Sequence, residues 1–426
     1  MISPLKGAVR TVLLRLATRG TGVPDLTQLK KVPEHLTYPL RRDGMDPLPQ
    51  MAHQRSEDPV TKLGSVLGLD IWLVTGHAET KKVLADTTSY SNDIRHLLGK
   101  KKRDGADEVG GLGMTDPPDH TRLRGLITPE FTMRRLKRLE ATIDEVIATA
   151  LDKMEAHGPV VDMVEDFGFE IPFRVICDLL GLPEDTRDEF HHLGVARFDV
   201  SKGGPGVFGS AAETRTFLIN AVKEQRDDPG EGLIGEILRT HGADFDDVEL
   251  GGLADGVFLG GYETSAAMLS MGALVLAQNP VAYADLRSGS PKKVNAVVEE
   301  LLRYLCPVQV AFPRFAKQDL DLFGHTVTKG SVVIASLVGA NRDPEAVPHP
   351  EQFDLRNAST QHFAFGHGMH RCVGAELARM EMRASLVALS NRFPDLTLDS
   401  TDYDDFGFRD LSIVYGLDRL PVRIHG

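Results

Sequence analysis

The sequence predicts a mainly α-helical protein with small β-sheets. Long stretches with helical spacing of apolar residues, each ended by Pro, Gly or a polar turn, dominate the chain, whereas stretches rich in Val and Ile are few and short. No internal repeat or Pro/Ser-rich linker divides the 426 residues, so we expect one continuous domain over residues 1–426.

The individual elements follow from the same periodicity. We expect helices at residues 136–157, 208–226, 254–279, 292–305 and 376–391, and strands at 71–74, 332–337 and 420–424. Residues 1–20 combine apolar side chains at helical spacing with basic but no acidic side chains, which predicts an amphipathic helix packed on the body, or alternatively a membrane-surface helix. No stretch reaches the ~20 uncharged apolar residues of a transmembrane helix, so no transmembrane anchor is expected.

Charge and cysteine content exclude several classes of protein. The formal net charge of -13 repels phosphate backbones, so bulk nucleic-acid binding is not expected. Three widely spaced cysteines form neither a disulfide framework nor a Cys-x-x-Cys zinc site, which indicates a reducing, cytoplasmic location. The glycines of residues 204–209 have the spacing of a dinucleotide fingerprint, but a Pro lies among them and no suitable strand precedes them, so we interpret this segment as a flexible hinge.

The most informative segment surrounds Cys372. Gly366 and Gly368 permit a sharp turn before the cysteine, and a helical pattern follows it, so unpaired amides and the positive end of a helix dipole are expected near the sulfur. These features favour a thiolate that binds a metal. The other interpretation, a buried free thiol, suits Cys177 and Cys306, which have neither a glycine-rich turn nor cationic neighbours in the sequence.

This segment resembles the haem-binding loop of the cytochrome P450 family. The matching positions are Phe365, Gly366, Gly368, His370, Cys372 and Gly374. The resemblance implies the P450 fold, a triangular helical body in which haem b (iron protoporphyrin IX) is buried between an oxygen-activation helix and the cysteine loop. It also implies that Cys372 is the axial iron ligand, that Phe365 packs against the haem and sulfur, and that His370 reaches a haem propionate. Gly366 and Gly374 are then part of the cofactor-binding loop.

Glu263 is the only charged residue between positions 256 and 279, in a stretch that is apolar all round and therefore buried. Because an isolated buried carboxylate is costly, Glu263 is a functional candidate unless an arginine from elsewhere pairs with it. Together with Thr264 it resembles the family's oxygen-activation segment, in which an acid and a hydroxyl supply the protons that dioxygen requires. The preceding Gly260 and Gly261 are expected to leave room for oxygen.

Two further groups of residues resemble motifs of the same family. His120 and Arg124 lie four residues apart on one predicted helix face and, with Arg314, resemble haem-propionate donors. Together with His370, they provide four donors for two propionates. Glu300 and Arg303 resemble the Glu-x-x-Arg motif that holds the core behind the haem, so we assign them a structural role.

Electrons and substrate come from outside this sequence. It contains nothing that resembles a flavin or NAD domain, so the resemblance implies a separate ferredoxin and ferredoxin reductase. The basic segment 133–138 is a candidate docking site, with a solvated helix face as the alternative. The segments that resemble substrate-facing parts are 99–113, 257–261, 308–312 and 411–413. Apart from the charged first one they are largely apolar, which predicts a lipophilic substrate such as a fatty acid, terpenoid or polyketide.

The resemblance therefore implies a cytochrome P450 monooxygenase that uses O2 and two electrons to hydroxylate or epoxidise a lipophilic small molecule. The alternatives are a haem-thiolate peroxygenase or isomerase on the same fold, a haem carrier or sensor, and a helical protein without haem. Glu263 and Thr264 favour the monooxygenase, because the peroxygenase and the isomerase do not need an oxygen-activating acid and hydroxyl.

Overall fold

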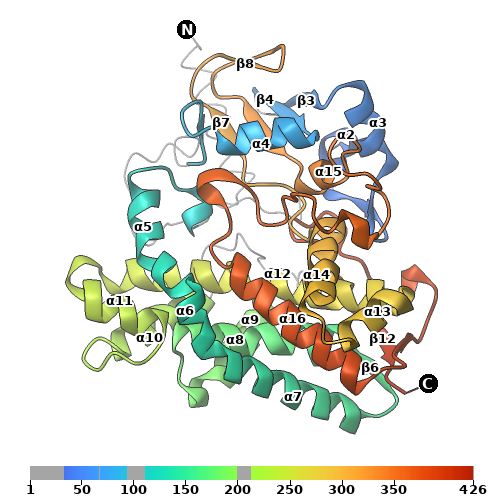
Figure 1. The fold of residues 1–426 in the computed structure, drawn as a ribbon. Coiled ribbons are helices and arrows are strands. Elements are labelled where there is room, and N and C mark those ends of the chain that lie inside the picture. Colours follow the sequence, from blue (N-terminus) through green and yellow to red (C-terminus); the bar gives the residue numbers. More distant parts are fainter. Residues whose placement is uncertain (1–32, 67, 94–110, 199–212, 426) are drawn as a thin grey trace.

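The computed structural model describes residues 33–66, 68–93, 111–198 and 213–425 (Figure 1). The predicted helix at 1–20, the hinge at 204–209 and most of the loop at 99–113 lie outside these ranges. A large helical body makes up one part of the molecule, and the main sheet with its adjoining short helices lies at the other end (Figure 1). The mainly helical character expected from the sequence is confirmed.

Helices account for most of the described structure. They are α2 (Glu34–Thr37), α3 (Pro49–Glu57), α4 (His77–Ala85), α5 (Asp119–Ile127), α6 (Met133–Leu136), α7 (Glu140–His157), α8 (Glu170–Leu180), α9 (Arg187–Phe198), α10 (Glu213–Glu224), α11 (Leu233–His241), α12 (Asp247–Gln278), α13 (Pro280–Arg287), α14 (Pro291–Leu305), α15 (Leu337–Asn341) and α16 (Ala375–Arg392). Short 3-10 or π segments that matter below are η4 (Gly111–Met114), η5 (Thr128–Phe131), η6 (Lys137–Leu139), η7 (Val164–Phe169) and η12 (Gly368–His370).

The long helices confirm the elements expected from the sequence, although α7 begins at Glu140 rather than at 136 and residues 208–212 of the helix expected at 208–226 lie outside the described ranges. The largest difference in bounds concerns α12. Helix α12 begins at Asp247, earlier than the predicted 254, because Asp246 caps it by accepting a hydrogen bond from the Glu249 amide at 2.7 Å. Glycines in the first turns hide this start from an analysis of apolar spacing. The helix ends at Gln278, just before Asn279 and Pro280.

The sheets are small, as expected. The main sheet of the described chain has the order β3 (Val60–Val66), β4 (Leu69–Val74), β10 (Val332–Ala335), β7 (Arg314–Ala316) and β5 (Tyr90–Ser91). β10 runs parallel to β4, and Val332 pairs with Ile71. A second sheet has the order β11 (Thr397–Leu398), β12 (Pro421–Arg423) and β6 (Val160–Asp162), and β1 (Arg42–Asp43) with β2 (Asp46–Pro47) and β8 (Leu320–Leu322) with β9 (His325–Val327) form hairpins.

Helix α12 is the centre of the helical body. It packs against α8, α10, α14, α16 and η7, and most of its side chains from Leu250 to Leu276 are buried. Burial on several faces explains why its sequence is apolar all round rather than amphipathic. Among the described residues, no single helix is long and apolar enough to span a membrane. Helices α12 and α13 meet that criterion only as a pair bent by 112°.

Candidate functional site

The loop that carries Cys372 is held in shape by its own backbone. The Cys372 amide donates to the Phe365 carbonyl at 2.9 Å, and the Gly366 amide donates to the Phe363 carbonyl at 2.8 Å. Gly368 has a φ of 72°, and a Cβ there would lie 2.3 Å from the Leu84 carbonyl oxygen, so only glycine fits this turn. The loop leads directly into α16, whose N-cap is Gly374. The predicted turn and helix start are both confirmed.

A partly buried ion pair between Arg379 and Glu299 packs against the loop. Arg379 of α16 lies over the Phe365 ring, 4.6 Å from its centroid, and its Nε donates to Glu299 of α14 at 2.6 Å. His362 contacts the same carboxylate at 3.1 Å. Burial raises the pKa of Glu299, but the hydrogen bonds and charges of His362 and Arg379 lower it by more. The resulting pKa is about 2. The carboxylate is therefore ionised at neutral pH and anchors Phe365 through Arg379.

The three cysteines differ in how exposed they are, whereas the thiol pKa is raised in all three. Cys177 and Cys306 are buried, as expected, and burial raises the pKa of each thiol to about 12. Cys306 does lie near the cations Arg42 and Arg342, which the sequence did not indicate. Cys372 is half-buried, and burial raises its pKa too, against the opposing effects of the Gly374 amide and Arg124.

The cost of burying the charge thus exceeds the effect of the nearby donors on the pKa of the Cys372 thiol. A thiol that coordinates a metal is deprotonated by that metal. What distinguishes Cys372 from the other two cysteines is its exposed side and its glycine-rich loop.

His120 and His370 come together beside this loop. Their ring centroids are 4.4 Å apart, and both ring nitrogens of His120 and the Nε2 of His370 are buried without a hydrogen-bond partner in the described part of the chain. Burial, Arg314, His120 and Arg124 lower the pKa of His370 to about 3, and burial and Arg124 lower the pKa of His120. Both rings are thus neutral at neutral pH, and each offers an N–H donor.

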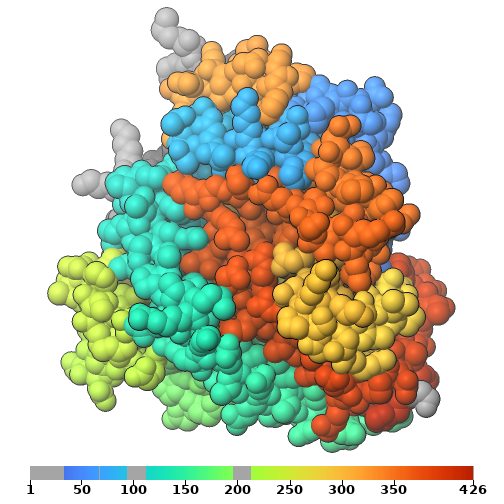
Figure 2. All heavy atoms as spheres, viewed as in Figure 1, coloured from blue at the N-terminus to red at the C-terminus, as the bar shows by residue number. Residues whose placement is uncertain are grey.

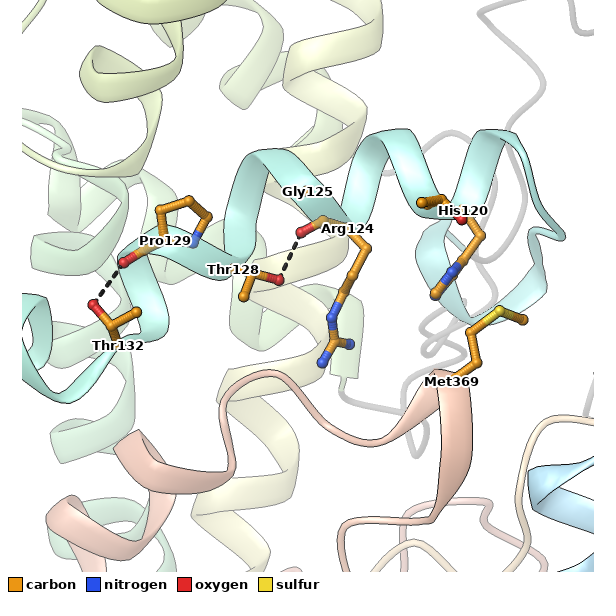
Figure 3. Close-up of a pocket in the computed structure, with 8 residues that line it drawn as sticks. His120, Arg124, Gly125, Thr128, Pro129, Thr132 and Met369 are labelled. Carbon is orange, nitrogen blue, oxygen red and sulfur yellow. Dashed lines mark hydrogen bonds between the residues drawn. The ribbon is translucent and has the colours of Figure 1, made fainter.

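Two arginines supply positive charge at the same place. Figure 3 shows Arg124 and His120 pointing from α5 toward the segment that carries Met369. Arg314 of β7 is buried, its Nη1 donates to the Phe312 carbonyl at 3.1 Å, and burial lowers its pKa to about 10. Across the described ranges, neither guanidinium forms an ion pair with a carboxylate.

Two guanidinium groups without a carboxylate partner and three partnerless ring nitrogens in the described chain fit an anionic ligand, because buried polar groups are otherwise hydrogen-bonded. The two carboxylates of haem fit this donor set in charge and number. The four residues His120, Arg124, Arg314 and His370, which the sequence suggested as propionate donors, are therefore compatible with that role. We call these four side chains the cationic cradle.

An open groove is lined by two residues of the cradle, His120 and Arg124. Its volume is about 690 Å³, and it lies between α5 and η5 on one side and Met369 of η12 on the other. Figure 2 shows the surfaces of α5 and of the cysteine loop side by side on this face. Its outer rim is formed by exposed side chains, among them Thr128 and Thr132.

Glu263 is buried on α12, as expected, but an arginine from elsewhere does pair with it. Arg409 Nη1 lies 3.3 Å from Glu263 Oε1, and Arg409 Nε donates to Asp418 at 2.8 Å. The inference that Glu263 is functional because its burial is uncompensated is therefore wrong. Its relation to Thr264 is then the remaining reason to assign it a role.

Thr264 and the two glycines before it occupy different environments. The Thr264 hydroxyl donates to the Gly260 carbonyl at 2.7 Å, so its oxygen has lone pairs left to accept from water. A Cβ on Gly260 would meet nothing within 4 Å, whereas one on Gly261 would lie 2.9 Å from Cδ1 of Ile176 in α8. The expectation of open space is confirmed for Gly260 and wrong for Gly261, which allows the close packing of two helices.

Glu300 and Arg303 form the structural pair that the sequence indicated. Both are buried, and Arg303 Nε donates to Glu300 Oε2 at 2.7 Å. Arg303 also donates to the carbonyls of Asn341, Pro350 and Gln352 at 2.8 to 2.9 Å. The pair holds the irregular segment before the cysteine loop.

Comparison with known proteins decides the family. A cytochrome P450 family model matches residues 292–406. Cytochrome P450 165C4 from Amycolatopsis orientalis is 37% identical over 363 residues, which cover 84% of this chain and 89% of that protein. This chain belongs to the cytochrome P450 family. The P450 is a monooxygenase with haem b as its cofactor, and the predicted fold class is confirmed.

Two further relatives extend the comparison. 6-deoxyerythronolide B hydroxylase from Saccharopolyspora erythraea is 34% identical over 389 residues, covering 88% of the P450 and 95% of that protein. The crystal structure of OxyC, a cytochrome P450 implicated in an oxidative C–C coupling reaction during vancomycin biosynthesis, has a TM-score of 0.79 at 35% identity, covering 90% of the P450 and 95% of that chain.

The sequence missed Arg409 and the support from Glu299. Neither residue is part of a local motif, and their partners lie far away in the chain. The only available signal for Arg409 was the general expectation that a buried carboxylate has a partner.

Proposed function

We propose that this P450 inserts one oxygen atom from O2 into a lipophilic small molecule, by hydroxylation or epoxidation. The observation that carries the proposal is the cationic cradle beside the cysteine loop, which fits a dianionic haem and lies next to the one cysteine that is not fully buried. When bound, haem b supplies the iron at which dioxygen is activated. The whole chain, residues 1–426, is proposed to act as a single domain located in the cytoplasm.

We assign the residues of the cysteine loop as follows. Cys372 Sγ is the metal ligand. Phe365 belongs to the same loop, and Arg379 packs over its ring. Gly366 and Gly374 have no side chain and would let the loop backbone approach the cofactor. In the cradle, Arg124 and Arg314 would neutralise the propionates, and the neutral rings of His120 and His370 would each donate a hydrogen bond.

Glu263 and Thr264 are proposed as the catalytic residues on α12. Thr264, whose hydroxyl proton is held by the Gly260 carbonyl, accepts a hydrogen bond from water in the open space beside Gly260. Glu263 replaces the proton that this water gives up. The pair supports the monooxygenase over a peroxygenase or isomerase on the same fold, neither of which needs protons from this segment.

The substrate is proposed to be a bulky lipophilic molecule of polyketide or similar natural-product type. The segments expected to face it include Phe312, an aromatic side chain that is 38% exposed and lies against Gly113 of η4. Apolar surface of this kind favours an apolar ligand. Among the classes that the sequence left open, a relative named for hydroxylation of 6-deoxyerythronolide B favours a polyketide over a fatty acid or terpenoid.

Electrons are proposed to come from a ferredoxin and its reductase. The basic segment 133–138 lies on α6 and η6, but Arg135 and Arg138 both pair with the buried Glu130, which reduces the net charge of the patch. Arg134 and Lys137 are exposed, so an acidic partner has these two cations to contact.

The deciding experiment is the absorption spectrum of the reduced, carbon-monoxide-bound protein. We expect the red-shifted thiolate band in the parent and its loss in Cys372→Ser, with Cys177→Ser as the matched control. A parent without the band, in folded protein loaded with haem, would contradict the role of Cys372. A screen of lipophilic compounds for a spin-state shift then identifies the substrate class, and binding of fatty acids alone would contradict the polyketide assignment.

A further inference from the structure

Arg409 connects Glu263 of α12 with Asp418, which lies in the non-helical segment before β12. Arg409 lies in the segment after α16, and its side chain bridges the buried Glu263 of α12, at 3.3 Å, and the exposed Asp418, at 2.8 Å. The guanidinium also lies over the Phe169 ring of η7, 5.4 Å from its centroid. An arginine in this position cannot release its own proton, so it acts on Glu263 only through charge and geometry.

The backbone around Arg409 fixes its position. The Arg409 amide donates to the Gly416 carbonyl at 3.0 Å, and the Asp418 amide donates to the Gly407 carbonyl at 2.9 Å, which closes residues 407–418 into a hairpin-like loop. Phe408 and Leu417 form a β-bridge inside it. Arg409 and Asp418 therefore stand opposite each other at the base of this loop, which we call the C-terminal loop.

The tip of the C-terminal loop is the segment 411–413 that the sequence suggested as substrate-facing. It is tied to the chain after α14, because the Gln309 amide donates to the Ile413 carbonyl at 3.0 Å and Gln309 Nε2 donates to the Ser412 carbonyl at 2.7 Å. Leu411 adopts a φ of 58° at this tip. One rigid loop thus carries both the expected substrate contact and the arginine that holds the acid.

We propose that Arg409 is a positioning residue for the oxygenation reaction, which holds the Glu263 carboxylate in place beside Thr264 and sets the pH range over which this acid delivers protons. Asp418 competes for the same guanidinium and so weakens its hold on Glu263. This inference rests on the proposed function of Glu263 and Thr264 and adds to it the group that controls the acid.

Other titratable groups lie close to Glu263 and Arg409. Tyr262 precedes Glu263 on α12 and is buried, and burial together with Glu170 and Cys177 of α8 raises the Tyr262 pKa far above its ordinary value. Glu170 pairs with Lys153 and Arg174. Arg409 is a cation in direct contact with Glu263, and it also pairs with Asp418.

The first measurement uses the resting holoenzyme without turnover. Infrared difference spectra over a pH titration report the protonated-carboxyl band of Glu263, which is assigned by its absence in Glu263→Gln. In Arg409→Gln we expect the titration midpoint to rise by about one to three pH units, because an opposite charge in contact lowers a carboxyl titration by that amount. Arg409→Lys keeps the positive charge, so its titration midpoint should stay close to that of the parent.

Asp418→Asn tests the link from the other side. It removes the competing carboxylate, so the midpoint should move down, opposite to the effect of Arg409→Gln. Shifts in opposite directions from two substitutions at the base of one loop are not expected from general loosening of the fold. Arg423→Gln is the matched control, because Arg423 pairs with Asp399 at 2.6 Å on the neighbouring strand β12 and should leave the midpoint unchanged.

The second measurement is the pH profile of coupling, the product formed per pair of electrons consumed. In Arg409→Gln the profile should move to higher pH together with the infrared midpoint, while the reduced carbon-monoxide spectrum stays as in the parent. If Arg409→Gln behaves like Arg423→Gln in both measurements, the proposal is overturned. If Glu263→Gln itself leaves coupling unchanged, the proposed role of Glu263 fails instead, and the two failures are therefore distinguishable.

Discussion

The imidazole rings of His120 and His370 lie 4.4 Å apart, centroid to centroid, although one ring comes from α5 and the other from the cysteine loop. Between them, three buried ring nitrogens have no hydrogen-bond partner in the described structure. Buried ring nitrogens without a partner favour a ligand that accepts hydrogen bonds from them. The fold therefore brings two distant histidines together to meet an anion.

Replacing His120 by Phe is expected to weaken haem retention without unfolding the protein. The ring is buried and a phenyl ring keeps the tilted contact with His370, but one hydrogen bond to a charged group is lost, which is worth about 1.5–3 kcal/mol. Haem transfer to a scavenging apoprotein should become about 10- to 100-fold faster. Arg122→Gln is the control on the same helix, because Arg122 pairs with Glu249 and not with the cradle. Equal transfer rates in the two variants would contradict the donor role of His120.

Replacing Thr264 by Ala is expected to keep haem binding and to divert electrons into peroxide. The Thr264 hydroxyl is anchored to the Gly260 carbonyl and is the group that holds water next to the open space beside that glycine. Without it, general acid catalysis is lost, and the coupled rate should fall by about 10- to 100-fold. Peroxide released per electron pair is the measurement. Thr264→Ser, which keeps the hydroxyl, should recover most of the coupling, and unchanged coupling in Thr264→Ala would remove this residue from the reaction.

Gly260 and Gly261 are expected to respond oppositely to alanine. At Gly260 the new methyl meets no atom within 4 Å, so helix propensity alone should stabilise the fold by about 1 kcal/mol, while the filled space lowers coupling. At Gly261 the methyl meets Ile176 at 2.9 Å, and overpacking should outweigh propensity to destabilise by up to about 2 kcal/mol. Denaturant unfolding measures both. Equal stability changes would show that the two helix faces are equivalent, contrary to the packing described.

Replacing Glu299 by Gln is expected to lower stability in a pH-dependent way. The folded-state pKa of about 2 lies below the ordinary value of 4.5, so the stabilisation is fully present above about 4.5 and is lost as the pH falls through the folded value. At neutral pH the loss should be about 1–3 kcal/mol, measured by denaturant unfolding. The difference from the parent should shrink steadily between pH 4.5 and 2.

The control for this prediction is Glu376→Gln. Glu376 pairs with the same Arg379, but its side chain is 43% exposed, so its loss should cost at most about 1 kcal/mol. A difference between parent and Glu299→Gln that is constant down to pH 2 would show that the Glu299 charge does not hold the loop.

Much of the site could be predicted from local sequence. Cys372, its glycine turn and the following helix are contiguous, and His120 and Arg124 lie one helical turn apart on α5, so short-range geometry is sufficient to place them. Glu300 and Arg303 form their ion pair within a single helix, as their spacing indicated. Each of these predictions depends on contacts made within a few residues.

The remaining features depend on contacts between residues that are far apart in the sequence. The sequence alone determined a helical fold, an apolar central helix and a cysteine in a glycine-rich turn before a helix, because periodicity and turn chemistry are local properties. Only the tertiary structure decided that Arg409 pairs with Glu263, that Gly261 faces Ile176 while Gly260 faces open space, and that burial raises the pKa of Cys372. Ion pairing, close helix packing and the burial of charge all involve residues far apart in the chain, and their energies depend on distances that only the folded protein sets.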